Sequence, residues 1–155
     1  MKTALFPGSF DPVTLGHQDL ILRSARLFDR VVVAVGHNTQ KRYAYPVEQR
    51  VEWLRRVFAQ HPNIEVRSYS CLTIDLCRQL GIGYIVRGIR NEADFRYESD
   101  IAAANRMLCP DVETLYLPCS PACASISSSL VRELMSFGHS VEDLLPEAIR
   151  PDFAR

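Results

Sequence analysis

The chain has 155 residues, of which 47% are hydrophobic and 23% charged, values ordinary for a soluble globular domain with its own core. Lys plus Arg and Asp plus Glu each number 18, so the formal net charge is zero. This balance excludes the cationic excess that non-specific nucleic-acid binding requires, but it allows a local pocket for one phosphorylated small molecule. The length predicts a single domain over residues 1–155. The charge balance predicts that it has no nucleic-acid partner.

No stretch approaches the roughly 20 apolar residues of a membrane span, and the first apolar run meets Pro7 and Gly8 too early for a signal peptide. We expect a cytoplasmic protein with no membrane partner. The cysteines are odd in number and show no C-x-x-C spacing, so we expect reduced, mostly buried thiols and no metal site built by the protein. They are Cys71, Cys77, Cys109, Cys119 and Cys123.

Short β-branched or apolar runs alternate along the chain with segments of helical periodicity. The predicted strands are Thr3–Phe6, Val31–Val35, Ile64–Arg67, Tyr84–Val86 and Thr114–Leu117. The predicted helices are Gln18–Phe28, Glu48–Gln60, Thr73–Leu80, Asp94–Leu108 and Ser128–Phe137. The alternation predicts an α/β fold, a Rossmann-like doubly wound sheet of about five parallel strands with helices on both faces. The tail after Leu145 reads as a short helix and a frayed end.

The segment from Gly8 to His17, GSFDPVTLGH, runs from the first strand into the first helix. Its glycines allow the backbone to approach a ligand, and the helix N-terminus attracts phosphate oxygens. Ser9 supplies a hydroxyl, and His17 a donor to a phosphoryl group when it is charged or in the suitable tautomer. The structural alternative is a tight turn in which Asp11 bonds backbone and His17 is half-buried. The glycine spacing fits neither a dinucleotide fingerprint nor a Walker A loop.

This segment resembles the start of bacterial phosphopantetheine adenylyltransferases, members of the T/H-x-G-H nucleotidyltransferase superfamily, in the form G-S-F-D-P-x-T-x-G-H. The run Arg87-Gly88-Ile89-Arg90, followed by Asp94-Phe95-x-Tyr97-Glu98, is similar to the family's ATP- and phosphopantetheine-binding segment. Two arginines leaving a strand can direct guanidinium groups at phosphate oxygens, and Glu98 can hydrogen-bond a ribose. Arginines paired on the surface with Asp94 or Glu98 are the alternative.

Two more segments match the family. Ser125-Ile126-Ser127-Ser128-Ser129 opens the last long helix, where serines can cap the helix and hold a phosphate. Lys41, in the loop after the second strand, corresponds to the family lysine near the reacting centre, with Arg42 as a substitute. Cys123 and Ser125 depart from the family pattern where aromatic residues are frequent, which leaves the packing of the adenine open.

The resemblance implies adenylyl transfer from ATP to 4'-phosphopantetheine, giving dephospho-coenzyme A and pyrophosphate by direct in-line attack. It implies catalytic roles for His17, Lys41 and Arg90, and phosphopantetheine contacts at Ser9, Lys41, Leu72, Thr73 and Arg87. The implied ATP contacts are Ser9, Phe10, His17, Gly88, Ile89, Arg90, Glu98, Ser125, Ile126, Ser127, Ser128 and Ser129.

The resemblance also implies Mg²⁺ accompanying ATP, a homohexamer and feedback binding of coenzyme A. Two other functions remain open at this point. One is a related nucleotidyltransferase with another acceptor, such as nicotinamide mononucleotide or glycerol 3-phosphate, against which the R-G-I-R…D-F-R-Y-E segment argues. The other is a nucleotide-binding sensor without turnover, against which the joint presence of His17, Lys41, Arg87 and Arg90 argues.

Overall fold

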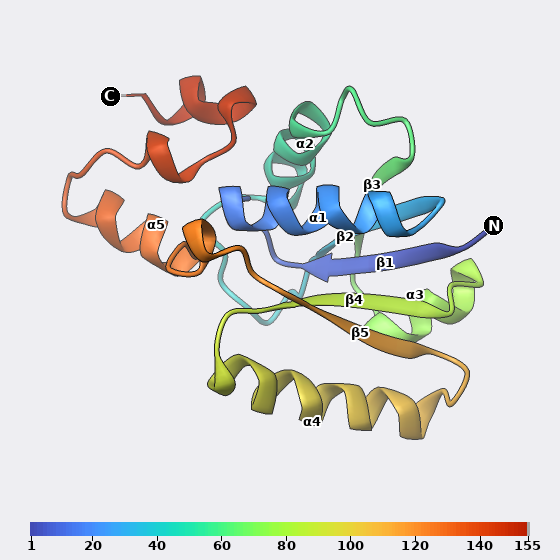
Figure 1. The fold of residues 1–155 in the computed structure, drawn as a ribbon. Helices are drawn as coiled ribbons and strands as arrows, with labels where there is room; N and C mark the ends of the chain where they lie inside the picture. The colour runs from blue at the N-terminus through green and yellow to red at the C-terminus, as the bar shows by residue number, and fades with distance from the viewer. Residues whose placement is uncertain (155) are drawn as a thin grey trace.

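The computed structural model describes residues 1–154 as a parallel sheet of five strands in the order β3-β2-β1-β4-β5, with helices around it (Figure 1). The strands are β1 (Thr3–Gly8), β2 (Arg30–Gly36), β3 (Ile64–Tyr69), β4 (Tyr84–Ile89) and β5 (Glu113–Pro118). The helices are α1 (Leu15–Leu27), α2 (Val47–Val57), α3 (Thr73–Leu80), α4 (Glu92–Leu108) and α5 (Ser128–Ser136). The predicted fold class and the type of every predicted element are confirmed, with bounds that differ by a few residues.

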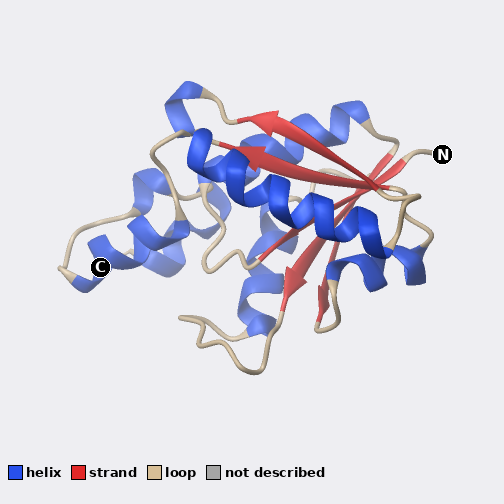
Figure 2. Ribbon diagram, turned by 90° about the horizontal axis from the view of Figure 1, so that it is seen from below, coloured by secondary structure: helices blue, strands red, loops and turns tan. Residues whose placement is uncertain are grey.

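The strand sequences are apolar on both sides because both faces of the sheet are covered. Ala4 and Phe6 of β1 face one core, which α1, α2 and α5 complete, whereas Leu5 faces a second core with α3. Along β2, Val31, Val33 and Val35 alternate in the same way with Val32 and Ala34. Figures 1 and 2 show helices on both sides of the strands, as this alternation requires.

The order of the strands places a crevice at the carboxyl ends of β1 and β4. β1 pairs with β2 on one side and with β4 on the other. The chain therefore builds the sheet outward from β1 first through β2 and β3, and then on the other side through β4 and β5. The loops that follow β1 and β4 therefore diverge to opposite faces and leave a gap between them. The Gly8–His17 loop and the Arg87–Arg90 segment meet at this gap.

The tail after Leu145 contains a short 3₁₀ helix, η3 (Glu147–Phe153), as predicted, but it is packed rather than frayed up to Phe153, and Arg155 lies outside the described residues. Ile149 and Phe153 are buried, and the ring of Phe153 packs against that of Trp53 on α2. The Trp53 indole Nε1–H donates to the Asp152 carboxylate at 2.7 Å. The two apolar residues are four apart with Pro151 between them, and this short segment shows no recognisable periodicity.

The expectation of mostly buried thiols is also wrong. All five cysteines are free, but only Cys77 is buried, whereas Cys71 is exposed and the other three are half-buried. Two of those three, Cys119 and Cys123, line the crevice, where packing is incomplete. Within residues 1–154, no helix is long and apolar enough to cross a membrane.

Candidate active site

A cavity of about 270 Å³ opens at the carboxyl ends of β1 and β4. Its walls come from the loop after β1, the start of α1, the end of β4, one face of α4 and the turn before α5. Of the predicted site residues it brings together Ser9, Phe10, His17, Arg87, Gly88, Arg90, Glu98, Ile126, Ser127 and Ser128. Segments separated by more than a hundred residues thus converge on one space large enough to enclose part of a nucleotide.

The loop after β1 is shaped by Phe10, whose backbone has φ of 50°, a left-handed conformation uncommon outside glycine. This turn buries the Phe10 ring and lays it over Gly8, where an added Cβ would come within 3.0 Å of ring atoms. The Phe10 ring also packs edge-on against the His17 ring, with centroids 5.0 Å apart. Gly8 and Phe10 therefore position His17.

The first turn of α1 determines which nitrogen of His17 carries the proton. Thr14 is the N-cap, and its hydroxyl accepts the His17 backbone N–H at 3.4 Å. In return, Nδ1 of His17 accepts the Thr14 backbone N–H at 3.0 Å. Nδ1 is therefore an unprotonated acceptor, and the neutral ring carries its proton on Nε2. Sequence reasoning missed the role of Thr14 as the N-cap. The signal was present, because Thr14 lies three residues before His17, which is the spacing of a capping box.

The electrostatic surroundings keep the His17 ring neutral. Burial lowers its pKa to about 4, and the positive charges of Arg87 and Arg90 act in the same direction. At neutral pH His17 is thus a neutral hydrogen-bond donor through Nε2. Of the two possibilities left open by the sequence, charge or tautomer, the structure supports the tautomer.

The two arginines of the cavity are held by carboxylates of α4. Arg87 donates through Nε and Nη2 to Glu98 at 2.9 and 2.7 Å, and its Nη1 donates to the carbonyl of Pro7. Arg90 donates through Nε to Asp94 at 3.0 Å, and this bond lowers the pKa of the Asp94 carboxyl. The surface-pairing alternative and the phosphate-binding hypothesis are therefore compatible, because the paired guanidinium groups still line the cavity.

The serine segment combines capping with a tie to the first loop. Ser127 is the N-cap of α5, and its hydroxyl accepts the Leu130 N–H at 3.1 Å. The Ser128 hydroxyl donates to the carbonyl of Pro12 at 2.7 Å. The N-terminus of α5 therefore faces the cavity in a fixed position, as an anion site requires.

Several predicted site residues lie outside this cavity. Lys41 is exposed in the loop between β2 and α2, and Leu72 is exposed before α3. The Thr73 hydroxyl is 2.9 Å from that of Tyr69. Ile89, Ser125 and Ser129 also do not line the cavity. Lys41, Leu72 and Thr73 follow β2 and β3, whose carboxyl ends lie at the same edge of the sheet as the cavity.

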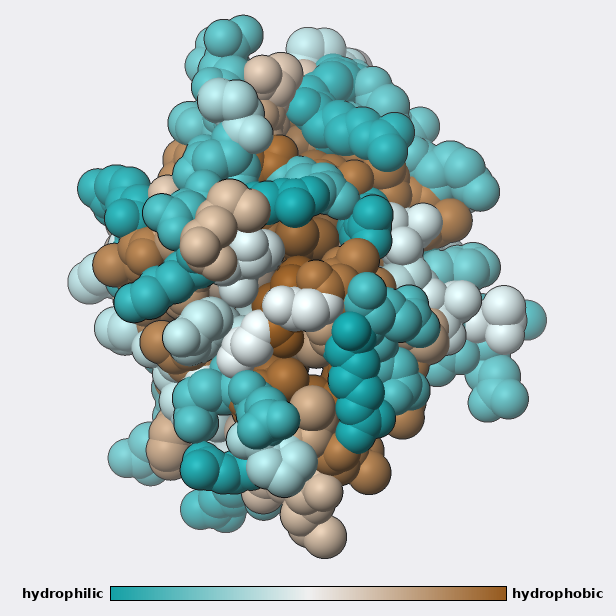
Figure 3. All heavy atoms as spheres, turned by 90° about the vertical axis from the view of Figure 1, so that its right-hand side faces the viewer, coloured by the Kyte–Doolittle hydropathy of each residue, from teal (hydrophilic) through white to brown (hydrophobic). Residues whose placement is uncertain are grey.

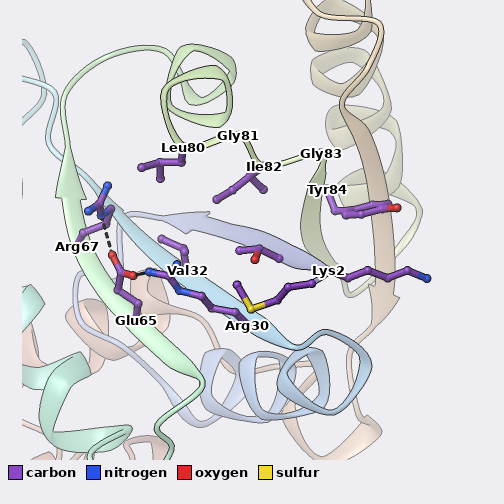
Figure 4. A pocket seen from close by; sticks show the side chains of 12 residues that line it. Lys2, Arg30, Val32, Glu65, Arg67, Leu80, Gly81, Ile82, Gly83 and Tyr84 are labelled. Atoms are coloured by element: carbon purple, nitrogen blue, oxygen red, sulfur yellow. Dashed lines mark ion pairs between the residues drawn. The ribbon is translucent and has the colours of Figure 1, made fainter.

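A second cavity, of about 470 Å³, lies at the opposite edge, where the strands begin. Seen from that side, the surface is mostly hydrophilic with apolar atoms near its centre (Figure 3). Arg30 and Arg67 flank Glu65 and both pair with it (Figure 4). None of the motif residues reaches this cavity, and parallel sheets bind ligands at the other edge, so we do not assign the active site to it.

Comparison with known proteins shows the family of the chain. The pattern of the cytidylyltransferase-like family matches residues 5–134, so the chain belongs to this family. More narrowly, it belongs with the phosphopantetheine adenylyltransferases. It is 46% identical to that enzyme of Flavobacterium psychrophilum over 97% of this chain and 99% of the relative. It is 50% identical to that of Porphyromonas gingivalis over 93% and 94%, respectively.

A solved structure shares the fold. The bifunctional NMN adenylyltransferase/ADP ribose pyrophosphatase from Francisella tularensis superposes with a TM-score of 0.70 at 14% identity. The match covers 94% of this chain and 44% of that one. At this identity the likeness supports the architecture alone.

Proposed function

We propose that the chain transfers the adenylyl group of ATP to 4'-phosphopantetheine, releasing pyrophosphate and forming dephospho-coenzyme A. The observation that carries this proposal is the neutral His17 ring, whose Nε2–H is available beside Arg87 and Arg90 at the mouth of a strand-end cavity. The full-length similarity to phosphopantetheine adenylyltransferases supports the choice of acceptor.

The reaction needs positioning and charge stabilisation rather than a covalent intermediate. An oxygen of the acceptor phosphate attacks the α-phosphorus of ATP, and the bond to the bridging oxygen of the β-phosphate breaks. The negative charge leaves on pyrophosphate. The phosphate dianion is itself a nucleophile near neutral pH, so no general base is required. A neutral Nε2–H donor can stabilise the α-phosphoryl oxygens as charge develops on them.

The remaining roles follow from position. ATP lies between the Arg87–Arg90 segment and the N-terminus of α5, with its phosphates toward His17 and Arg90. Lys41 acts at the reacting phosphates and, with Ser9 and Arg87, holds the acceptor phosphate, while Leu72 and Thr73 contact the acceptor arm. Mg²⁺ enters with ATP, bound to its phosphates and to water. Within residues 1–154, no three His, Cys, Asp or Glu side chains are grouped to hold a metal.

We also propose that the protein acts in the cytoplasm as a homohexamer subject to feedback binding of coenzyme A. The support for self-association is α4, which buries only Glu98. Large apolar side chains of α4 and the neighbouring β5 are exposed: Phe95, Tyr97, Ile101, Met107, Leu108 and Leu115. An excess of exposed large apolar side chains on one helix and its neighbouring strand is a feature of protein–protein interfaces. Light scattering coupled to size exclusion gives the mass, and a monomer at micromolar concentration contradicts this assembly.

The function is tested by pyrophosphate release from MgATP with 4'-phosphopantetheine, nicotinamide mononucleotide or glycerol 3-phosphate. We expect release only with phosphopantetheine.

The role of His17 is tested by H17A. This variant lowers kcat by about a hundredfold or more, the cost of one lost transition-state donor, and spares ATP binding. The matched control R67A removes a cation that lines the other cavity, and its turnover stays at the wild-type level. Release with a different acceptor contradicts the proposed substrate, and ATP binding without release for any acceptor favours the sensor.

A further inference from the structure

Arg50 is the largest fully buried side chain of the described residues, with 1% of its surface exposed, and it lies outside every motif considered above. It projects from the first turn of α2. Within residues 1–154 no carboxylate is in direct ion-pair contact with it, although the negative charges of Asp11 and Glu48 act to raise its pKa. Burial accordingly lowers the pKa of its guanidinium. A buried charge without an ion-pair partner is expensive, so its retention needs a reason beyond packing.

The partners of Arg50 are backbone carbonyls from three segments. Nη1 donates to the carbonyl of Ser9 at 2.8 Å and to that of Gly36 at 2.9 Å. Nε donates to the carbonyl of Tyr45 at 3.0 Å. One side chain thus joins the loop after β1, the end of β2 and the end of the β2–α2 loop. The planar guanidinium group holds its donors apart in fixed directions, which the compact ammonium group of lysine does not.

The β2–α2 loop, residues 37–46, has no regular structure and carries Lys41 at its exposed turn. Two sets of contacts attach it to Arg50 and to the loop after β1. The Tyr43 ring lies over the Arg50 guanidinium, with Cζ 4.0 Å from the ring centroid. The Asp11 carboxylate accepts the Ala44 and Tyr45 N–H groups at 2.8 and 3.0 Å. Arg50 and Asp11 therefore both connect the Lys41 loop to the His17 loop.

We propose that Arg50 is a positioning residue for adenylyl transfer, holding the Lys41 loop in register with the Ser9–His17 loop so that acceptor phosphate and ATP meet in line. This inference rests on the proposed function. Arg50 bonds the backbone of Ser9 and of the Lys41 loop but no residue of the Arg87–Arg90 segment or of the α5 N-terminus, so we expect its effect mainly at the acceptor phosphate.

The test is a double-mutant cycle between Arg50 and Lys41. R50K keeps the charge but cannot span three carbonyls, and it lowers kcat by about tenfold or more, since a displacement of about 1 Å can cost a hundredfold. The dissociation constant for ATP changes by less than about twofold. In the K41A background, R50K has little further effect, because the two residues act as one unit.

Two further variants separate positioning from folding. L54A leaves a hole in the core under the same helix, so it lowers Tm without touching the loop, and its kcat well below Tm stays near wild type. Y43L removes the ring over the guanidinium without burying a charge, and it provides the same test if R50K does not fold. Its kcat falls in the wild-type background but not further in K41A.

The outcomes distinguish this inference from the proposed function. Wild-type protein without phosphopantetheine-dependent release overturns both. An active wild type whose K41A variant retains full turnover overturns the inference alone. Independent, multiplicative effects of the Arg50 or Tyr43 and Lys41 substitutions overturn it too, as does a loss of kcat in L54A equal to that in R50K.

Discussion

The protonation state of His17 gives a prediction whose magnitude follows from the structure. The folded-state pKa of about 4 lies below the ordinary value of 6.5. Between these values the unfolded chain binds the proton and the folded chain does not. Stability from neutral His17 is therefore fully present above pH 6.5 and is lost as the pH falls toward 4. At about 1.4 kcal/mol per pH unit, roughly 2 kcal/mol is lost between pH 7 and pH 5. Because the ring is partly exposed in the cavity, this is an upper bound.

The variant H17Q isolates this contribution. Glutamine does not titrate, and its amide oxygen can accept the Thr14 N–H as His17 Nδ1 does, since Thr-x-x-Gln is itself a capping box. All other titrating groups are common to both proteins. Urea unfolding at pH 7 and pH 5 should show the wild type losing up to about 2 kcal/mol more than H17Q.

The ring can also be followed directly. The histidine Cε1 proton shifts in NMR spectra give a titration midpoint for each ring, and H17Q assigns the His17 resonance by its absence. A midpoint well below 6 agrees with the argument. A midpoint near 6.5, together with the same pH dependence in wild type and H17Q, refutes it, and His17 would then be able to act as a cation.

Two other predictions concern the walls of the cavity. Because Cys119 and Cys123 line it, MgATP should slow their alkylation in a mass-spectrometric time course, whereas exposed Cys71 reacts at an unchanged rate. Buried Cys77, whose pKa burial raises to about 11, should stay unmodified, and equal rates with and without ATP contradict the placement of the nucleotide. G88A puts a Cβ 2.3 Å from Cδ1 of the buried Leu20, so both Tm and ATP affinity should fall. The control G83A meets its nearest atom at 3.7 Å, and a G88A protein as stable as G83A would show that Leu20 yields freely.

The fold was predictable because its signals are local. The residues Val31–Val35 of β2 form an unbroken apolar run. Such a run is fully buried only in a strand that is covered on both faces of the sheet. The positions of the motifs at strand ends followed from this alternation, and the cavity confirms that the first loop, the arginine segment and the serine turn converge.

Long-range contacts were beyond the reach of sequence patterns. Arg50 stands in a helical window rich in charged residues, and nothing local distinguishes it from the exposed Arg55. Its burial depends on carbonyls contributed by Ser9 and Gly36, far away along the chain. The burial of Phe153 likewise depends on Trp53, about a hundred residues earlier. Such pairings are set by how the elements pack, which a periodicity of two or 3.6 residues does not encode.

The first loop also shows why structural and chemical explanations of a motif need not compete. Asp11 bonds backbone and His17 is half-buried, as a purely structural turn requires. Yet the cap bond from the Thr14 N–H to Nδ1 also leaves the His17 proton on Nε2, the tautomer that can donate to a phosphoryl oxygen. The helix start and the hydrogen-bond donor are therefore one arrangement. A substitution that disturbs the cap should alter turnover even where the His17 ring itself is retained.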